Sequence, residues 1–154
     1  MAKDKYGKYI VPAPVMFSKM FPQITRPQIN VWGADTMNGI PFTMNWSCLT
    51  EPFVMVEKSH SHEFDQVICF IGGDSRDIRE FGGEIWFYFG EEEEKHVITS
   101  PSYICVPRGV VHAPLIVKKI DKPVVYMDFP LTGQYMKKDT DTGKNKKLRR
   151  VKHD

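Results

Sequence analysis

Frequent interruption by Gly and Pro is the feature that most constrains this chain. The 154 residues include 11 Gly and 11 Pro. No window shows a sustained apolar stripe with a period of 3.6 residues and helix caps at its ends. Short runs rich in β-branched and aromatic residues instead lie between turn signals such as Gly72-Gly73-Asp74 and Pro107-Arg108-Gly109. The chain is therefore predicted to form an all-β domain.

The strands are expected to be short and closely spaced. The first run alternates, with Ile40, Phe42, Met44, Trp46 and Cys48 on one face and polar residues on the other. Further strands are predicted over residues 53–60, 66–71, 84–89, 96–99, 103–106, 111–117 and 124–129. Strands with this spacing, separated by turns, are typical of a sandwich or a barrel.

The two ends differ from the middle, so three segments are expected: an arm over residues 1–36, a barrel over 37–130 and a basic tail over 131–154. The arm contains Pro12, Pro14, Pro22 and Pro27 among scattered apolar residues, which suggests an extended segment. Residues 137–154 hold eight Lys or Arg against three Asp. This tail lacks interleaved aromatic residues and a recognisable reading module, so nucleic acid is not an expected partner.

The chain is expected to be cytoplasmic and without membrane contact. No stretch approaches the roughly 20 apolar residues that span a bilayer, and the polar start lacks the apolar core of a signal peptide. Cys48, Cys69 and Cys105 form neither an even set nor a C-x-x-C pair, so we expect reduced, buried thiols.

Two closely spaced histidines, His60 and His62, provide the first indication of chemistry. Their i, i+2 spacing puts both rings on one face of a strand, together with Val54 and Val56. Imidazoles that point inward with apolar side chains need a partner. They could satisfy each other and nearby backbone groups, or they could bind a metal ion.

Further candidate ligands follow in the sequence. Gln66 comes soon after His62, and His112 follows the Pro107-Arg108-Gly109 turn at the start of another apolar run. Three imidazoles and one carboxamide oxygen can converge on a single ion. Glu63 and Asp65 are rivals for the fourth position, because carboxylates bind divalent ions better than a carboxamide does.

The chain resembles the cupin superfamily, specifically its RmlC-like metal-binding members. The segment from His60 to Gln66, followed by Gly72, is similar to the first cupin motif, and the run from Pro107 to His112 matches the P-x-G-x-x-H of the second. The resemblance covers roughly residues 40–129. It implies a double-stranded β-helix, a jelly-roll-like barrel that holds a metal ion inside or at its mouth.

Four positions depart from the cupin pattern. Val54 and Pro101 stand where the two motifs usually begin with Gly, and Ile116 stands where the second often ends in Asn. The fourth is Gln66 in place of the usual Glu. The resemblance and strand parity favour Gln66 over Glu63 and Asp65 as the ligand. A set of three His and one Gln carries no charge, so the bound ion would favour anionic ligands.

The expected cofactor is one divalent transition metal, with Fe, Mn and Zn as the leading candidates. The pocket is expected to be small and apolar. Its predicted lining is Met44, Trp46, Ile68, Phe70, Phe87 and Ile116, with Tyr103, Tyr126 and Asp128 as polar candidates. Asp128 interrupts an apolar strand and is a candidate general base, unless strand parity turns it outward.

The resemblance implies a metal-dependent small-molecule protein, and the first hypothesis is an enzyme acting on an oxygen-containing organic substrate. Dioxygenase, lyase, isomerase and decarboxylase reactions all occur on this fold, so an oxidoreductase or a lyase is expected. A non-catalytic metal-binding or sensing module is the alternative. A purely structural cupin is a third reading, against which the intact histidines argue. The arm and the dimers common in the family suggest a homodimer.

Overall fold

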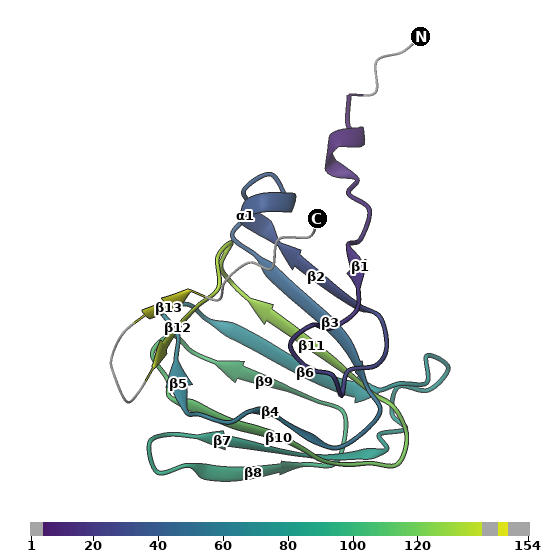
Figure 1. Cartoon of the computed structure of the whole chain (residues 1–154), viewed down its shortest axis with the longest axis vertical. Coiled ribbons are helices and arrows are strands. Elements are labelled where there is room, and N and C mark those ends of the chain that lie inside the picture. The colour runs from purple at the N-terminus through teal and green to yellow at the C-terminus, as the bar shows by residue number, and fades with distance from the viewer. Residues whose placement is uncertain (1–4, 140–144, 148–154) are drawn as a thin grey trace.

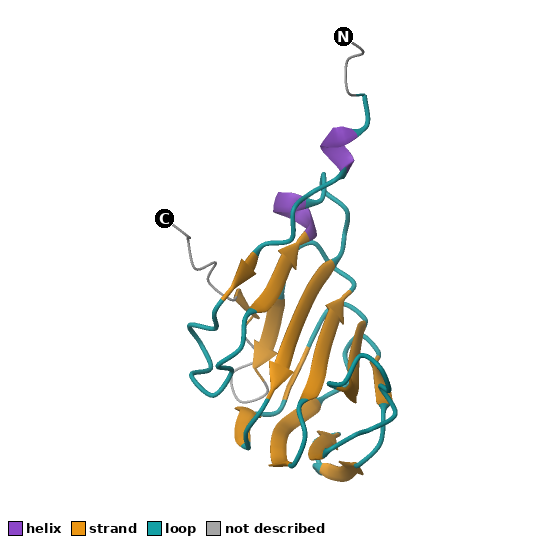
Figure 2. Cartoon of the chain, turned by 90° about the vertical axis from the view of Figure 1, so that its right-hand side faces the viewer, coloured by secondary structure: helices purple, strands orange, loops and turns teal. Residues whose placement is uncertain are grey.

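The computed structural model describes residues 5–139 and 145–147, which form two packed antiparallel sheets (Figures 1 and 2). Sheet A contains, in spatial order, β1 (Val15–Met16), β2 (Gln28–Trp32), β3 (Thr43–Leu49), β11 (Val124–Pro130), β6 (Gln66–Gly72) and β9 (Ser102–Val106). Sheet B runs β13 (Asn145–Lys147), β12 (Met136–Asp139), β5 (His60–Ser61), β10 (His112–Ile120), β7 (Gly83–Phe89) and β8 (Glu94–Ile98), and β4 (Phe53–Val56) also pairs with β10. The helical elements within the described residues are the short η1 (Gly7–Tyr9) and α1 (Gly33–Thr36). The all-β prediction is confirmed.

Apolar side chains between the two sheets form the core. Along β6, burial alternates residue by residue, so that Ile68 and Phe70 face sheet B. The buried apolar cluster comprises Ile24, Leu49, Met55, Ile68, Phe70, Ile85, Phe87, Val106, Leu115, Val117 and Val124. This core fills one part of the space between the sheets, and polar residues from β5, β6, β10 and β11 occupy another.

The prediction for the inward face of β3 is wrong. Met44 and Trp46 are half-buried on the outer side, whereas Ser47 and Leu49 are fully buried on the inner side. The polar side chains of β3 can face inward because their cross-strand neighbours are polar too. Asn45 Nδ2, for example, donates to Asn30 Oδ1 at 2.5 Å. Hydrogen bonding between neighbours removes most of the cost of burying these groups.

Two further parity predictions are wrong because the strands are irregular. In β10, the register against β7 shifts between His112 and Leu115. Ala113, with φ at +78°, lies within this shift. Leu115 therefore faces the core, and Ile116 turns to the outer side. Val54 is 47% exposed, because β4 ends before the chain reaches His60 and the two are not on one continuous strand.

Strands continue past both of the expected barrel boundaries. β2 lies within the expected arm and pairs with β3, and its first four residues alternate polar and apolar side chains. Ile24 joins the core, while residues 5–14 extend away from the sheets (Figure 1). At the other end, β12 pairs with both β5 and β13. Most of the basic run over residues 144–150 lies outside the described residues.

The three cysteines lie on the outer side of sheet A. Cys48 and Cys69 are half-buried and Cys105 is exposed, so the prediction of buried thiols is wrong for Cys105. Each cysteine is next in sequence to a buried residue on the same strand, so its side chain points to the opposite face. Cys69, for example, precedes the buried Phe70. All three are free thiols. In the part of the chain described, no helix has the length and apolar character needed to cross a membrane.

Candidate metal centre

Three histidines that are distant in sequence meet between the sheets. His60, at the start of β5, pairs across the strands with His112, at the start of β10, and His62 follows directly after β5. One ring nitrogen of each lies within 4.8 Å of the others, and the three residues are only 2–5% exposed. Aromatic rings support the cluster: Phe64 stacks on His62 with ring centres 4.6 Å apart, and Phe87 lies parallel to His112.

The backbone fixes the orientation of two of these imidazoles. His60 Nδ1 lies 3.0 Å from the carbonyl oxygen of Lys58, and His112 Nδ1 lies 3.0 Å from that of Val110. A carbonyl oxygen only accepts hydrogen bonds, so Nδ1 must carry the proton in both rings. Nε2 then keeps its lone pair for another partner, and this is the arrangement that holds metal-binding histidines.

The turn of the second motif is fastened to the same cluster. Gly109 has φ at +79°, a conformation that favours glycine, and its N–H donates to the carbonyl of His62 at 2.8 Å. The N–H of Arg108 donates to Asp65 Oδ1 at 2.8 Å. The Pro-x-Gly turn therefore links the segment after β5 to the start of β10, which places His62 beside His112.

Gln66 extends the polar cluster from sheet A. Its side chain is buried, and Nε2 donates to Asp128 Oδ1 at 2.6 Å. Its other end, Oε1, is buried and has no hydrogen-bond partner among the described residues. The rival carboxylates are differently placed, because Glu63 is exposed and exposed Asp65 accepts the bond from Arg108. The structure thus brings Gln66 and Asp128 into the interior and leaves the two rivals outside.

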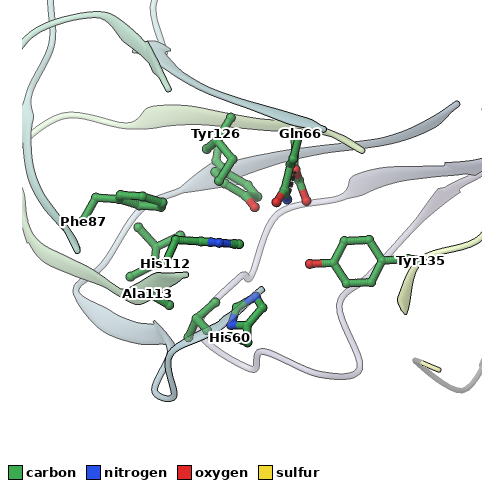
Figure 3. A pocket seen from close by; sticks show the side chains of 11 residues that line it. His60, Gln66, Phe87, His112, Ala113, Tyr126 and Tyr135 are labelled. Carbon is green, nitrogen blue, oxygen red and sulfur yellow. Dashed lines mark hydrogen bonds between the residues drawn. The ribbon is translucent and has the colours of Figure 1, made fainter. Parts of the chain in front are cut away.

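A cavity of about 30 Å³ lies beside these groups. Its polar lining is His60, Gln66, His112, Tyr126, Asp128 and Tyr135, and its apolar lining includes Ile68, Phe87 and Leu115 (Figure 3). Tyr126 and Asp128 were candidates from the sequence, and Asp128 does face inward. Tyr103, by contrast, is 73% exposed and lies on the outer side of β9.

Tyr135 is the site residue that the sequence pattern does not reveal. It lies in the expected tail, yet its hydroxyl is 3.2 Å from His62 Nε2 and its ring packs against those of His62 and Phe64. In Figure 3 its hydroxyl points toward the imidazoles. The signal that could have found it is a lone aromatic residue two positions after Gly133, where the surrounding sequence turns polar.

The two tyrosines of the cavity remain protonated near neutral pH. Burial raises the pKa of Tyr126 well above its usual value, and the charge and hydrogen bond of Asp128 raise it further. Burial also raises the pKa of Tyr135, as does the charge of Asp128, while a hydrogen bond from Gln66 lowers it. Both hydroxyls are therefore available as donors.

Across the described residues, the three histidines are the one group of three or more His, Cys, Asp or Glu side chains arranged to hold a metal ion. The acidic run at residues 91–94 lies in the exposed turn before β8 and at its first residue. Glu93 accepts a hydrogen bond from Ser59 at 3.0 Å. This run is a solvated turn, as four adjacent acidic residues usually are.

No protein-family model and no curated protein sequence matches the chain. Several solved structures are similar to it. Peruvianin-I, a cysteine peptidase from Thevetia peruviana latex, has a TM-score of 0.56 at 12% identity and covers 96% of this chain and 80% of its own. A recombinant oxalate oxidase in complex with glycolate has a TM-score of 0.54 at 11% identity, with 86% of this chain and 62% of that one covered.

HppE in its Fe(II) form has a TM-score of 0.50 at 12% identity and covers 77% of this chain. This chain spans 56% of the length of HppE and 62% of that of the oxalate oxidase, so both are longer proteins. Likeness at this level of identity shows the fold, and the names of these proteins cover different activities. With its two packed antiparallel sheets and with β5 and β10 bringing three histidines together, the chain has the cupin fold.

Proposed function

We propose that this chain binds one divalent transition metal through His60, His62, Gln66 and His112, and that it is an enzyme acting on a small oxygen-containing substrate. The observation that carries the proposal is the buried histidine cluster, with one ring nitrogen of each residue within 4.8 Å of the others. Gln66 Oε1 adds a buried acceptor without a hydrogen-bond partner. Such an acceptor costs about 1–3 kcal/mol unless something binds to it.

The donor set fits an ion of the first transition row. Imidazole nitrogens suit Fe, Mn and Zn better than Mg or Ca, and these three metals are the proposed candidates. When bound, the ion would supply Lewis acidity, and Fe or Mn would add redox chemistry. The backbone carbonyls of Lys58 and Val110 hold two of the rings in the tautomer that such an ion requires.

The dimensions and polarity of the cavity support a small substrate. A volume of about 30 Å³ accommodates roughly two water-sized groups. Tyr135 is a protonated donor at this cavity, and Phe87 and Leu115 form part of its apolar lining. A hydroxyl donor facing neutral ligands favours an anionic oxygen, such as that of a carboxylate or a deprotonated hydroxyl.

The proposed reaction class is that of an oxidoreductase or a lyase. One similar structure is that of an oxalate oxidase with glycolate bound, so glycolate and oxalate are the first compounds to test. The metal-free protein should be loaded with Fe(II) or Mn(II), and oxygen uptake and loss of the acid should be followed. Turnover that disappears in the variant His112→Ala supports an enzyme. Glycolate binding without turnover of any tested small acid would instead favour a binding or sensing role.

Metal content tests the first half of the proposal directly. Protein purified without an affinity tag should contain about one equivalent of a transition metal, and His112→Ala should lose most of it. His96→Ala is the matched control, because His96 lies on β8 and is exposed. Metal content far below one equivalent in the unaltered protein, unchanged by His112→Ala, would show that the proposal is wrong.

We also propose a homodimer that works in the cytoplasm without nucleic acid. The outer face of sheet A is rich in half-buried apolar side chains, and large apolar faces usually mark interaction surfaces. This face carries Val31, Met44, Trp46, Cys48, Val67, Cys69, Ile71, Met127 and Phe129. The three free cysteines, one of them exposed, fit a reducing compartment.

A further inference from the structure

The carboxylate of Asp128 accepts a hydrogen bond from a candidate ligand. Asp128 lies on β11 and Gln66 at the start of the neighbouring β6, and Gln66 Nε2 donates to Asp128 Oδ1 at 2.6 Å. Both side chains are buried. Tyr126, two residues before Asp128 on β11, lines the same cavity. Gln66 Nε2 thus holds the Asp128 carboxylate in place.

A carboxamide can be turned end for end, and Asp128 decides which end faces it. A carboxylate has only acceptors, so the amide NH₂ of Gln66 must face Asp128 and the oxygen must face elsewhere. The oxygen is indeed the atom without a hydrogen-bond partner, in a side chain that lines the same cavity as His60 and His112. With an apolar neighbour at position 128, nothing there would exclude the reversed orientation of the amide, which presents NH₂ to the ion.

We propose that Asp128 is a positioning residue that turns Gln66 Oε1 toward the histidines, rather than the general base expected from the sequence. This inference rests on the metal site proposed above. It also modifies the expectation of a neutral site, because Asp128 places one negative charge behind a neutral ligand. Gln66 and Asp128 together then act as a polarised pair, in which the carboxylate strengthens the donor character of the amide oxygen.

The experiment measures the affinity of the metal-free protein for Co(II) by competition with a chelator, together with the visible absorption of bound Co(II). Asp128→Asn should weaken Co(II) binding by about 10–100-fold and alter the absorption bands. In the background Gln66→Ala the same substitution should change the affinity less than about twofold, because residues that act through one another are not additive. Asp121→Asn, at an exposed turn, is the matched control.

A double variant that exchanges the carboxylate and the amide distinguishes loss of the contact between them from loss of folding. In the double variant Gln66→Glu with Asp128→Asn, the amide of residue 128 donates to a carboxylate at position 66, so the hydrogen bond and the total charge are kept. This variant should bind Co(II) at least as tightly as the unaltered protein. A double variant as weak as Asp128→Asn would overturn the proposal, and far-UV circular dichroism checks that each variant is folded.

Two other results would also overturn it. One is an equal loss of affinity from Asp128→Asn with and without Gln66, which would mean that Asp128 acts independently of the amide. The other is unchanged Co(II) affinity and absorption in folded Asp128→Asn. Failure of the metal site itself is recognised separately, because His112→Ala would then leave Co(II) binding unchanged and both proposals would fall.

Discussion

At the scale of single residues, the candidate site shows what sequence spacing can and cannot reveal. The i, i+2 histidines and the histidine after the Pro-x-Gly turn were predictable, because local geometry and the cupin motifs place them. The contact between Gln66 and Asp128 was not, because it depends on the register of β6 against β11. Tyr135 was missed because its contact with His62 bridges 73 residues of sequence.

Tyr135 leads to a prediction of whether removal of its hydroxyl strengthens or weakens metal binding. Its hydroxyl lies 3.2 Å from His62 Nε2, one of the two ring nitrogens with which His62 could bind a metal ion. In the metal-free protein this hydrogen bond must be broken before the ion binds. Tyr135→Phe keeps the ring packing on Phe64 and should therefore strengthen Co(II) binding by about fivefold, the equivalent of one hydrogen bond. Chelator competition measures it, and weaker binding would show that the phenol oxygen is itself a ligand.

Tyr126 predicts a loss of stability at alkaline pH. Burial and Asp128 raise its pKa in the folded protein, so the unfolded chain releases the proton first as the pH rises. Below about pH 10 both states keep the proton, so this group makes no contribution to the pH dependence of the free energy of unfolding. Above that pH the unfolded chain binds fewer protons, and the free energy of unfolding falls by up to about 1.4 kcal/mol per pH unit.

The variant Tyr126→Phe should make this decline shallower, because it removes the buried hydroxyl whose pKa is raised. Urea denaturation between pH 8 and pH 11.5 measures the slope. Tyr103→Phe, at an exposed hydroxyl, is the control and should leave the slope unchanged. Equal slopes for the unaltered protein and Tyr126→Phe would contradict the prediction.

At the scale of elements, the existence of the strands was predictable but their facing was not. Alternation shows that β3 has two different faces, and the usual rule assigns the apolar one to the interior. In this fold the rule fails, because the register aligns Asn30 of β2, Asn45 of β3 and Asp128 of β11 in one inner row. A polar row is tolerated inside only where each member finds a partner, and the sequence of one strand does not contain that information.

Ser47 tests the inverted facing of β3. Its hydroxyl is fully buried, 2.9 Å from Asn45 Oδ1 and 3.2 Å from Gln28 Oε1. Ser47→Ala should therefore lower the free energy of unfolding by about 1–2 kcal/mol in urea denaturation, because it leaves buried acceptors without a donor. Cys48→Ala, on the adjacent outer position, should cost less than about 1 kcal/mol. A larger loss in the free energy of unfolding for Cys48→Ala than for Ser47→Ala would mean that Met44, Trp46 and Cys48 face the core.

At the scale of the whole molecule, the fold was predictable because short strands, frequent turns and two spaced motifs all indicate the same architecture. Because polar side chains point inward on part of sheet A, apolar side chains lie on its outer face. One cross-strand row on sheet A runs through Ile29, Trp46, Met127, Cys69 and Tyr103, from β2 to β9. A half-exposed apolar row that crosses five strands is not expected to remain in water.

A second copy of the chain is the expected cover for this row. A stable dimer buries about 800 Å² on each partner, and the row spans five strands of sheet A. Light scattering at micromolar concentration should give twice the mass of one chain. Met127→Lys should shift the equilibrium to the monomer, because a charge at the centre of the row would be buried without a partner. Val97→Lys, on the exposed edge strand β8, should remain a dimer. A monomer in the unaltered protein, or a dimer that withstands Met127→Lys, would show that this face is not the interface.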